Sequence, residues 1–258
     1  MQVMTGAARK AGRRLARDFN EVEHLQVSRK GPADFVTNAD QKAEQIVYEE
    51  LSKARPGYGF LMEERGVVEG TDKSHRWIVD PLDGTLNFMH AQPHFAISIA
   101  LEREGELVAG VVYNPASDEL YHAEKGRGCY VNDRRLRVSE RRKFSEAVIA
   151  TGMPFFGKPG HAAFLKELHQ IMPHCAGIRR YGAASLDLAG VAAGRFDGYW
   201  ERNLSAWDVA AGIVLVREAG GLAGSIEKTG DVLETGDICA GNETMIEELR
   251  ARLAKAAQ

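Results

Sequence analysis

Apolar residues recur at helical spacing in the first part of the chain, with polar residues between them. The spacing predicts one amphipathic helix from Val3 to Val22 and a second from about Asn38 to Ala54. Lys30-Gly31-Pro32 should interrupt the chain between these helices, and Pro56-Gly57 should end the second one. The chain is therefore predicted to begin with two helices.

Shorter apolar runs follow, and their length and flanking turn residues are typical of strands. Two strands are predicted over Tyr58–Met62 and Arg76–Val79, and each of them runs into acidic residues. From Phe95 to Val138, apolar runs alternate with turn clusters rich in glycine, asparagine and aspartate. That alternation indicates an antiparallel meander.

After about Ser145 the pattern alternates between strands and helices. Strands are predicted over Ala147–Thr151, Ile178–Tyr181, Arg195–Trp200, Leu222–Ser225 and Ile238–Ala240, and helices over His161–Ile171, Ser185–Ala193, Trp207–Glu218 and Asn242–Lys255. The whole pattern indicates layered helices and sheets, in two subdomains over residues 1–144 and 145–258 that share a cleft.

The composition is ordinary for a globular protein. The 258 residues are 44% hydrophobic and 27% charged, which suits one large domain or two fused subdomains. The net charge of −3 argues against a general nucleic-acid binder. The basic run from Arg134 to Lys143 is interpreted as a solvated face. Apolar runs such as Phe95–Leu101 are too short to span a bilayer.

The cysteines and the first residues of the sequence indicate the cellular compartment of the protein. Cys129, Cys175 and Cys239 are few, odd in number and far apart, so we expect reduced thiols. Arg9 and Lys10 interrupt any apolar segment of the kind that a secretory signal needs. These features predict a cytoplasmic protein.

The stretch Trp-Ile-Val-Asp-Pro-Leu-Asp-Gly-Thr-Leu-Asn-Phe, residues 77–88, carries the clearest chemical signal. It places Asp80 and Asp83 three residues apart at the end of an apolar strand, where packing requires no acid. Two carboxylates this close repel unless a cation lies between them. Hard oxygen ligands suit Mg²⁺ or Mn²⁺ better than zinc. The following Asp-Gly-Thr offers backbone N–H groups to a phosphate, so we predict phosphoryl chemistry.

Three further acidic positions are ambiguous when each is taken alone. Thr37 and Asp40 fit a capping box at the start of the second helix. The pair Glu63-Glu64 fits a surface turn after a strand. Asp208 fits the first turn of a helix, where the helix dipole favours an acid.

Taken together, the acidic motifs resemble, in order and spacing, the inositol monophosphatase family of the Mg²⁺-dependent, lithium-sensitive phosphatase superfamily. The motifs are Asp34-Phe35-Val36-Thr37-Asn38-Ala39-Asp40, Glu63-Glu64, the segment 77–85 and Trp207-Asp208-Val209-Ala210-Ala211-Gly212. Residues 182–189 and 197–201 fit as well, so the resemblance covers nearly the whole chain. It implies an α+β fold, a layered α-β-α-β-α sandwich of the inositol monophosphatase/fructose-1,6-bisphosphatase type, as a single phosphatase domain over residues 1–258. It also implies a homodimer.

The resemblance further implies a set of metal ligands. Glu63, Asp80 and the backbone carbonyl of Leu82 would bind a first metal ion. Asp80, Asp83 and Asp208 would bind a second, and a third, weaker site would use Glu63 through waters. Two or three Mg²⁺ ions are therefore expected, and Mn²⁺ would also suit oxygen ligands.

Catalytic and substrate-binding roles are implied in the same way. Thr85 would orient the nucleophilic water together with Asp40 as general base, and Glu63 is the third catalytic residue. The expected substrate contacts are Glu63, Asp83, Gly84, Thr85, Ala184, Glu201 and Asp208. Among these, backbone N–H groups of Gly84 and Thr85 would hold the phosphate, and Glu201 would contact the hydroxyls of a polyol.

The predicted function is metal-dependent hydrolysis of phosphate monoesters by a metal-activated water, with myo-inositol 1-phosphate as the favoured substrate. Two metal ions about 3.5–4 Å apart can hold both the attacking and the leaving oxygen. Because phosphoryl transfer needs mostly positioning and charge neutralisation, no covalent intermediate is required. The enzyme would be an inositol-1-monophosphatase.

Alternatives remain open at this point. Fructose 1,6-bisphosphate, histidinol phosphate or a 3′-phosphoadenosine nucleotide would need the same chemistry, although the sequence gives no signal for an adenine pocket. A mainly regulatory protein that docks on an RNA-processing or transcription complex is supported only by the basic run. Met62, Arg65 and Leu86 depart from the family pattern, which bears on lithium sensitivity and on the weak third metal site.

Overall fold

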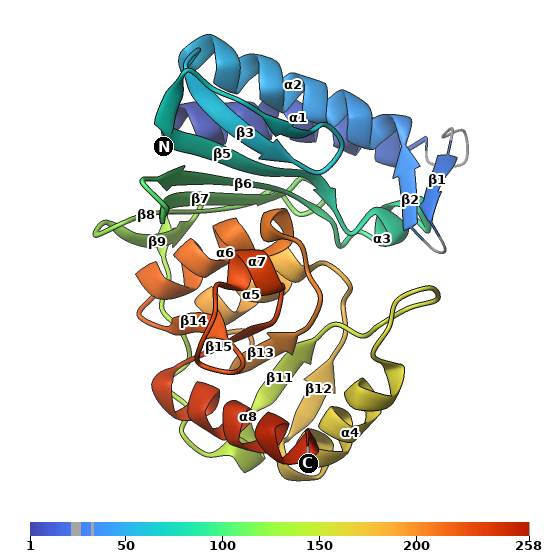
Figure 1. The fold of residues 1–258 in the computed structure, drawn as a ribbon, viewed down its shortest axis with the longest axis vertical. Helices are drawn as coiled ribbons and strands as arrows, with labels where there is room; N and C mark the ends of the chain where they lie inside the picture. Colours follow the sequence, from blue (N-terminus) through green and yellow to red (C-terminus); the bar gives the residue numbers. More distant parts are fainter. Residues whose placement is uncertain (22–26, 32–33, 258) are drawn as a thin grey trace.

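Helices and sheets alternate in layers through the molecule (Figure 1). The computed structural model describes residues 1–21, 27–31 and 34–257. An outer pair of helices covers an eight-stranded sheet, a central pair of helices lies between that sheet and a five-stranded sheet, and two more helices cover the far side. The predicted α-β-α-β-α sandwich is confirmed.

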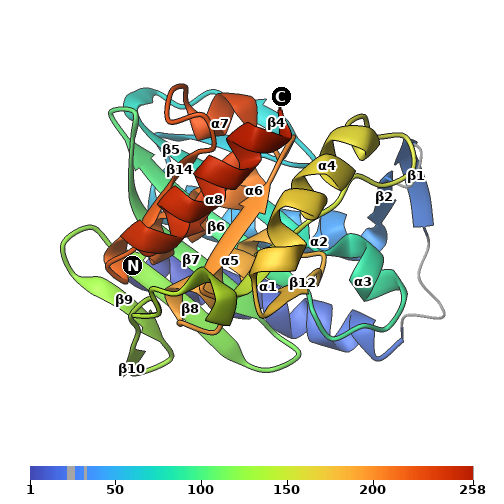
Figure 2. The ribbon, with the colours of Figure 1, turned by 90° about the horizontal axis from the view of Figure 1, so that it is seen from below.

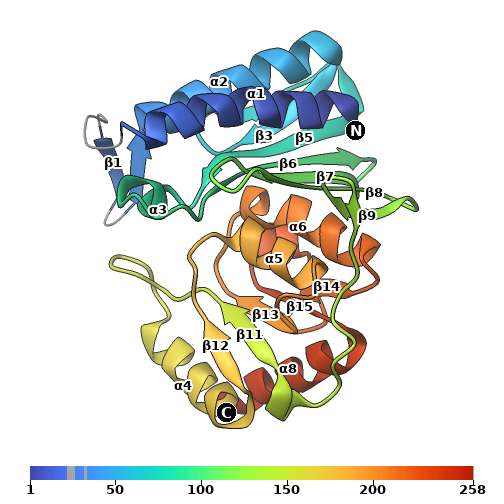
Figure 3. The ribbon, with the colours of Figure 1, turned by 180° about the vertical axis from the view of Figure 1, so that it is seen from behind.

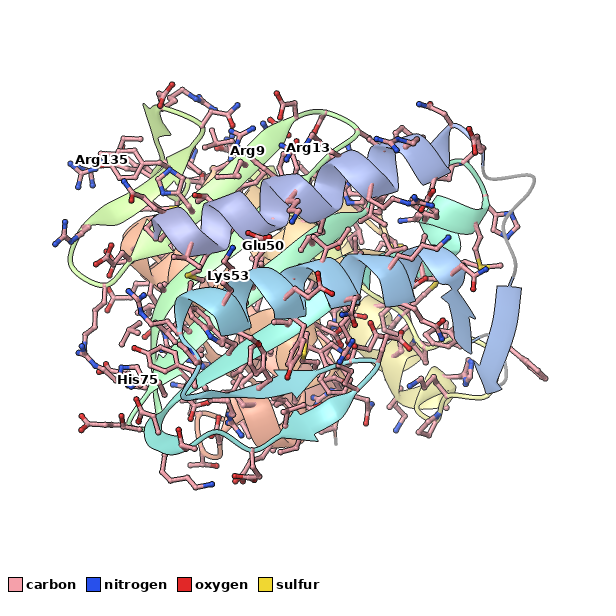
Figure 4. The ribbon with its side chains drawn as sticks, turned by 90° about the horizontal axis from the view of Figure 1, so that it is seen from above. Arg9, Arg13, Glu50, Lys53, His75 and Arg135 are labelled. Carbon is pink, nitrogen blue, oxygen red and sulfur yellow. The ribbon has the colours of Figure 1, made fainter. Side chains whose placement is uncertain are left out.

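The outer helices are α1 (Gln2–Phe19) and α2 (Asn38–Ala54). Small buried residues such as Ala8 and Ala43 allow these two helices to pack closely on each other and on the sheet. Charged side chains such as Arg13 and Lys53 occupy the outer face, which Figure 4 shows from above.

The segment between these helices was only partly predicted. Helix α1 ends at Phe19 rather than at Val22, and both Val22 and Pro32 lie outside the described residues. An antiparallel hairpin of β1 (Val27–Gly31) and β2 (Asp34–Thr37) follows, where the sequence indicated only a break. Such short strands carry too few residues for a periodic pattern to stand out.

The eight-stranded sheet has the order β10-β9-β8-β7-β6-β5-β3-β4. Its strands are β3 (Tyr58–Met62), β4 (Gly66–Val68), β5 (Asp72–Asp83), β6 (Ala96–Arg103), β7 (Glu106–Asn114), β8 (Glu119–Glu124), β9 (Gly128–Val131) and β10 (Arg134–Arg135). Strands β6 to β10 pair antiparallel in sequence order, so the predicted meander is confirmed. Helices cover both faces of the sheet, which explains its nearly continuous apolar runs.

Strand β5 differs from its prediction in a way that shapes the site. It was expected to end at Val79, but it continues through Asp80 and Asp83. Strand β6 keeps pairing with it there, as Asp80 faces Ser98 and Asp83 faces Ala96, with a shift of register between the two acids. The acids therefore lie within an irregular, paired strand end and not after it. Strand β4, only three residues long, was not predicted.

The second sheet has the order β12-β11-β13-β15-β14. Its strands are β11 (Val148–Thr151), β12 (Gly177–Arg179), β13 (Gly198–Glu201), β14 (Leu222–Ser225) and β15 (Ile238–Gly241). Helices α4 (His161–Ile171) and α8 (Glu243–Ala256) lie side by side on its outer face (Figure 2). All five strands and both helices were predicted, with no end more than three residues from its observed position.

The predicted start of β13 at Arg195 is wrong for a local reason. The backbone N–H groups of Arg195 and Phe196 both donate to the carbonyl of Gly190, so these residues close the end of a helix instead. Several short elements were not predicted from the sequence. They are α3 (Thr85–Met89), α7 (Val232–Thr235) and the 3₁₀ turns at Phe144–Glu146 and Met172–His174.

Helices α5 (Ala184–Ala192) and α6 (Ala206–Glu218) form the central layer, which Figure 3 shows between the two sheets. Both helices are apolar around most of their circumference, as expected for helices buried on two sides. The chain crosses from the first sheet to the second once, between Arg135 and Val148. The predicted division of the chain into subdomains over residues 1–144 and 145–258 stays a prediction.

Every helix in the described parts of the chain is too short or too polar to cross a membrane.

Gly110 on β7 lies at a close approach of the sheet to α6, and this contact yields a stability prediction. A Cβ atom at Gly110 would lie 2.6 Å from the carbonyl oxygen of Ala211. Gly110→Ala should therefore lower the free energy of unfolding by about 1–3 kcal/mol, because helix and sheet must separate. Urea denaturation measures this. Gly6→Ala is the control, because Gly6 lies at an exposed position of α1 and no atom lies within 4 Å of the added Cβ. This substitution should leave the stability unchanged or raise it. Equal stability of the Gly110→Ala variant and the wild type would contradict this packing.

Candidate active site

The start of α2 places Asp40 against Thr85. The Asp40 Oδ2 atom accepts hydrogen bonds from the Thr37 backbone N–H at 2.8 Å and from the Thr37 hydroxyl at 2.5 Å, which completes the predicted capping box. Thr85 Oγ1 lies 3.0 Å from Asp40 Oδ1 and 2.9 Å from the carbonyl oxygen of Leu82. Burial raises the pKa of Asp40, although these hydrogen bonds oppose the rise. Asp40 thus caps the helix with one oxygen and contacts Thr85 with the other.

The irregular end of β5 directs two carboxylates into the interior. Asp80 Oδ1 accepts the Leu82 backbone N–H at 2.9 Å, and Asp83 Oδ2 accepts the backbone N–H and the hydroxyl of Ser185 at 2.8 and 2.5 Å. Ser185 lies in the first turn of α5, so Asp83 joins the first sheet to the central helices. Gly84 then adopts a φ of +87° that leads into α3, a conformation that glycine tolerates best.

Asp208 reaches the same place from α6. Its Oδ2 atom accepts the Ser205 backbone N–H at 2.7 Å, which completes a second capping box. Glu63 follows β3, where its backbone N–H donates to the carbonyl of Val79 on the neighbouring β5. Four acidic residues from three separate segments of the chain therefore meet between α6 and the ends of β3 and β5.

The electrostatics of this group are unfavourable for the protein alone. Burial raises the pKa of Asp80 well above its usual range, and the negative charges of Glu63, Asp83 and Asp208 raise it further. Burial likewise raises the pKa of Asp208 well above normal, with Asp83 as the next cause. Burial raises the pKa of Asp83 to about 6. Such mutual repulsion is what a bound cation would relieve.

The donor set fits a divalent cation of the Mg²⁺ type, because it consists of a backbone carbonyl and four carboxylates, of which those of Asp80 and Asp83 are buried and those of Glu63 and Asp208 half-buried. Among the described residues, no three histidine, cysteine, aspartate or glutamate side chains are arranged as a finished metal cluster. The chemistry of the donors and the burial of Asp80 and Asp83 therefore carry the assignment.

The repulsion predicts how the stability of the metal-free protein depends on pH. Folded Asp83 has a pKa of about 6, against about 3.9 for an unfolded aspartate. The folded state therefore binds more protons in this interval, and its stability falls as the pH rises through it. In a chelator, the melting temperature should fall between pH 5 and pH 7. The fall in melting temperature should be smaller in Asp83→Asn. A wild-type melting temperature that stays constant or rises between pH 5 and pH 7 would contradict this prediction.

A clamp from α2 holds the turn that carries Glu63. The buried carboxylate of Glu44 accepts the Glu64 backbone N–H at 2.8 Å and lies 3.2 Å from the Arg65 guanidinium. The guanidinium also covers the ring of Tyr48, 4.5 Å from its centre. Arg65, one of the departures from the family pattern, therefore binds to α2.

Two of the expected substrate contacts, Glu201 and Ala184, belong to β13 and α5. Glu201, at the end of β13, accepts the hydroxyl of Tyr199 at 2.5 Å, and burial raises the pKa of Glu201 to about 7. Its carboxylate lies against Gly152, where any Cβ atom would overlap it. Ala184 is the first residue of α5, next to Ser185. Thus Glu201 and Ala184 approach the same region from different elements.

Sequence reasoning missed two parts of this region. Asp187 on α5 is buried with no hydrogen-bond partner for either carboxylate oxygen, and burial, followed by the charges of Glu201 and Asp83, raises its pKa well above normal. The sequence offered one signal for Asp187, an acid between two leucines in an apolar helix.

The second part that sequence reasoning missed is a pocket of ≈ 330 Å³ that adjoins Glu63, Glu201 and Asp208. Its remaining walls come from residues 152–167 and 200–207.

Known proteins resemble this chain over its whole length. The profile of the Inositol monophosphatase family matches residues 1–258. A protein of Caulobacter vibrioides called inositol-1-monophosphatase is 62% identical, over 98% of this chain and 100% of its own length. Nus factor SuhB of Escherichia coli K12 is 41% identical, over 98% of this chain and 95% of its own. The crystal structure of extragenic suppressor protein suhB from Bartonella henselae superposes with a TM-score of 0.96, at 58% identity, covering 99% of this chain and 98% of that one.

Proposed function

The chain belongs to the inositol monophosphatase family, and from that premise we propose that it hydrolyses inositol 1-phosphate to inositol and phosphate. The family consists of metal-dependent enzymes that hydrolyse phosphate monoesters. The observation that supports the proposal most strongly is the meeting of four acidic residues, Glu63, Asp80, Asp83 and Asp208, beside the hydrogen-bonded pair of Asp40 and Thr85.

We assign the metal ligands as the resemblance implied them. Glu63, Asp80, Asp83, Asp208 and the carbonyl of Leu82 would hold two or three Mg²⁺ ions. Bound there, Mg²⁺ lowers the pKa of water and neutralises charge on the phosphoryl and leaving oxygens. Mn²⁺ offers the same chemistry with similar ligands.

The Asp40–Thr85 pair supplies the base. The Thr85 hydroxyl donates to Asp40 Oδ1, which leaves its lone pairs to accept a hydrogen bond from the attacking water. As the water attacks phosphorus, its proton passes through the Thr85 hydroxyl to the Asp40 carboxylate. Burial raises the pKa of Asp40, and so makes it a stronger base near neutral pH.

Other residues position the ester. Backbone N–H groups of Gly84 and Thr85, where the chain turns into α3, would donate to phosphate oxygens. The Glu201 carboxylate and the backbone at Ala184 would contact ring hydroxyls, each of which can donate and accept. Asp83, Glu63 and Asp208 border the same space and complete the substrate contacts.

Phosphate release tests the proposal directly. The wild type should release phosphate from inositol 1-phosphate when Mg²⁺ is present and lose this activity in a chelator. Asp83→Ala serves as the inactive reference. Release no faster than that of the Asp83→Ala variant would overturn the proposal.

The clamp on the Glu63 turn gives a sharper prediction. Arg65→Ala should raise the Mg²⁺ concentration for half-maximal activity about 10-fold, the lower end of what supporting residues contribute to metal affinity. The reason is that Glu44 would lose the guanidinium that orients it toward the Glu64 N–H. Metal titrations followed by activity and by calorimetry measure the shift. Arg127→Ala, which breaks an exposed pair with Glu124, is the matched control. Coincident titration curves for Arg65→Ala and the wild type would refute the role of the clamp.

Several expectations stay proposals. We propose a homodimer and inhibition by lithium, which the family resemblance implies, and a cytoplasmic location, which the cysteines and the first residues favour. The regulatory alternative finds support in the name of the Escherichia coli relative, a Nus factor. In this chain, however, the basic run is partly neutralised, because Arg141 pairs with Asp197 and Glu146 and Lys143 also pairs with Glu146. The catalytic role is therefore the better supported of the two.

A further inference from the structure

Glu201 lies at the last position of β13, where the sheet supports the chain on one side only. The pairing of β13 with β11 ends at Trp200. On the other side, Glu201 still pairs with Ile238 of β15. Two residues after Glu201 the chain has left the sheet, and Asn203 adopts a φ of +59°. Contacts outside the sheet must therefore complete the support of Glu201.

The neighbours of Glu201 along the chain contact a different layer of the molecule. Successive side chains of a strand point to opposite faces. Glu201 lies against Gly152 and accepts the Tyr199 hydroxyl. Trp200 packs in the apolar cluster that α4 and α8 cover. The side chains before and after Glu201 can therefore be fixed by α4 without filling the substrate site.

Glu167 of α4 joins both of these neighbours. Its buried carboxylate accepts the Trp200 Nε1–H at 3.1 Å through Oε2 and the Arg202 Nε–H at 2.5 Å through Oε1. Phe164, on the same helix, stacks on the Trp200 ring, with ring centres 6.3 Å apart and planes 18° from parallel. The residues directly before and after Glu201 are thus tied to one side chain of α4.

The Arg202 guanidinium extends the same set of contacts to β15. Its Nη1 group donates to Oδ2 of Asp237, the residue before β15, at 2.7 Å. The other Asp237 oxygen accepts the Asn203 backbone N–H at 3.0 Å. A planar guanidinium can hold two carboxylates at fixed angles, whereas an ammonium group is a single flexible point charge. Arg202 thus connects α4 to β15 across the end of β13.

We propose that Arg202 is a positioning residue for substrate recognition: with Glu167 and Asp237 it fixes the end of β13, so that the Glu201 carboxylate is held ready for a substrate hydroxyl. The inference rests on the proposed function, in which Glu201 contacts the hydroxyls of the ring. Arg202 acts through Glu201, because its own guanidinium is already paired with Glu167 and Asp237. Recognition groups need such support, since shifts of about 0.5 Å spoil the geometry of their hydrogen bonds.

Substrates with and without ring hydroxyls test this role. Arg202→Met should lower the ratio of kcat/KM for inositol 1-phosphate to kcat/KM for 4-nitrophenyl phosphate by about 3- to 10-fold, the effect of losing one well-placed hydrogen bond. Most of the change should appear as a higher KM for inositol 1-phosphate, because the nitrophenyl group has no hydroxyl to offer to Glu201. Steady-state phosphate release measures both substrates.

Arg141→Met is the matched control at the opposite end of the same strand. Arg141 lies 3.2 Å from the carboxylate of Asp197, a buried acid directly before β13. Each substitution leaves a buried carboxylate without its arginine, so both should lower the melting temperature. Only Arg202→Met should lower the substrate ratio.

Arg202→Lys separates the position of Glu201 from the stability of the fold. Lysine keeps the positive charge beside the buried Glu167 carboxylate, but it lacks the planar fork that also holds Asp237. The variant should regain most of the melting temperature that Arg202→Met loses, while its substrate ratio stays below that of the wild type. If Arg202→Met does not fold, the ratio of Arg202→Lys decides alone: a value below the wild type supports the role, and an equal value refutes it.

The remaining outcomes are also decisive. An unchanged ratio in Arg202→Met refutes the positioning role and leaves the proposed function standing. If Arg202→Lys restores the ratio together with the melting temperature, or if Arg141→Met lowers the ratio as much as Arg202→Met, the contacts serve only the fold and the role is refuted. If the wild type releases no phosphate from inositol 1-phosphate in Mg²⁺, the proposed function fails and the positioning role fails with it.

Discussion

Replacing Asp80 with asparagine is expected to lower kcat/KM for phosphate release by about 10²–10³-fold or more, the scale of losing one essential electrostatic group. Asp80 is buried between Glu63, Asp83 and Asp208, and it is the residue that both proposed strong metal sites share. An amide of the same shape removes the charge that holds the cations. Steady-state phosphate release at several Mg²⁺ concentrations measures the loss.

The same substitution should not destabilise the metal-free protein. Asparagine keeps the oxygen that accepts the Leu82 N–H, and it removes a buried group whose charge is opposed by three neighbouring acids. In a chelator at pH 7.5, its melting temperature should equal or exceed that of the wild type, and Mg²⁺ should stabilise the variant less than it stabilises the wild type. A large loss of stability in the chelator would show that Asp80 serves the fold, and the account of the site would be wrong.

Replacing Asp40 with asparagine should lower kcat by about 10²–10⁴-fold, the range typical of a general base. The variant keeps an oxygen for the Thr37 N–H, but the atom facing Thr85 becomes a poor proton acceptor. We expect little change in KM, because Asp40 is not expected to contact the substrate. Stopped assays of kcat and KM measure both effects.

Two controls separate catalysis from helix capping at Asp40. Asn242→Ala removes a cap from α8 and two hydrogen bonds that its amide donates to the carbonyls of Ser139 and Arg141, so it should cost about 1–3 kcal/mol of stability with no change in kcat. Thr85→Val should lose about as much activity as Asp40→Asn, and the double variant should lose little more, since the two groups act as a unit. Additive losses in the double variant, or a kcat within a few-fold of the wild type in Asp40→Asn, would exclude the proposed base.

Long periodic segments made most of the fold predictable from the sequence. Helix α2 and strand β3 were predicted to the residue, because each has a clear apolar face and clear turn residues at its end. Elements of three to five residues, such as β4 and α7, were not predicted because they are too short for a period to appear. The extension of β5 through Asp80 was not predicted because pairing with β6, a tertiary interaction, decides where that strand ends.

The candidate site was predictable where its residues lie in compact motifs. Asp80 and Asp83 share one short segment, and Asp40 was correctly placed in a capping box as well as beside Thr85. The pocket was not predictable, because ordinary apolar residues form it once α4 packs against β13. Asp187 gave a weak signal as an acid between two leucines, but a single sequence does not show that both of its oxygens lack partners.

Anomalous diffraction from crystals soaked in Mn²⁺ tests the central claim most directly. The account predicts strong peaks between the carboxylates of Asp80, Asp83 and Asp208, and their loss in Asp80→Asn crystals. Phosphate release by the same preparation, with no peak at these carboxylates, would contradict it.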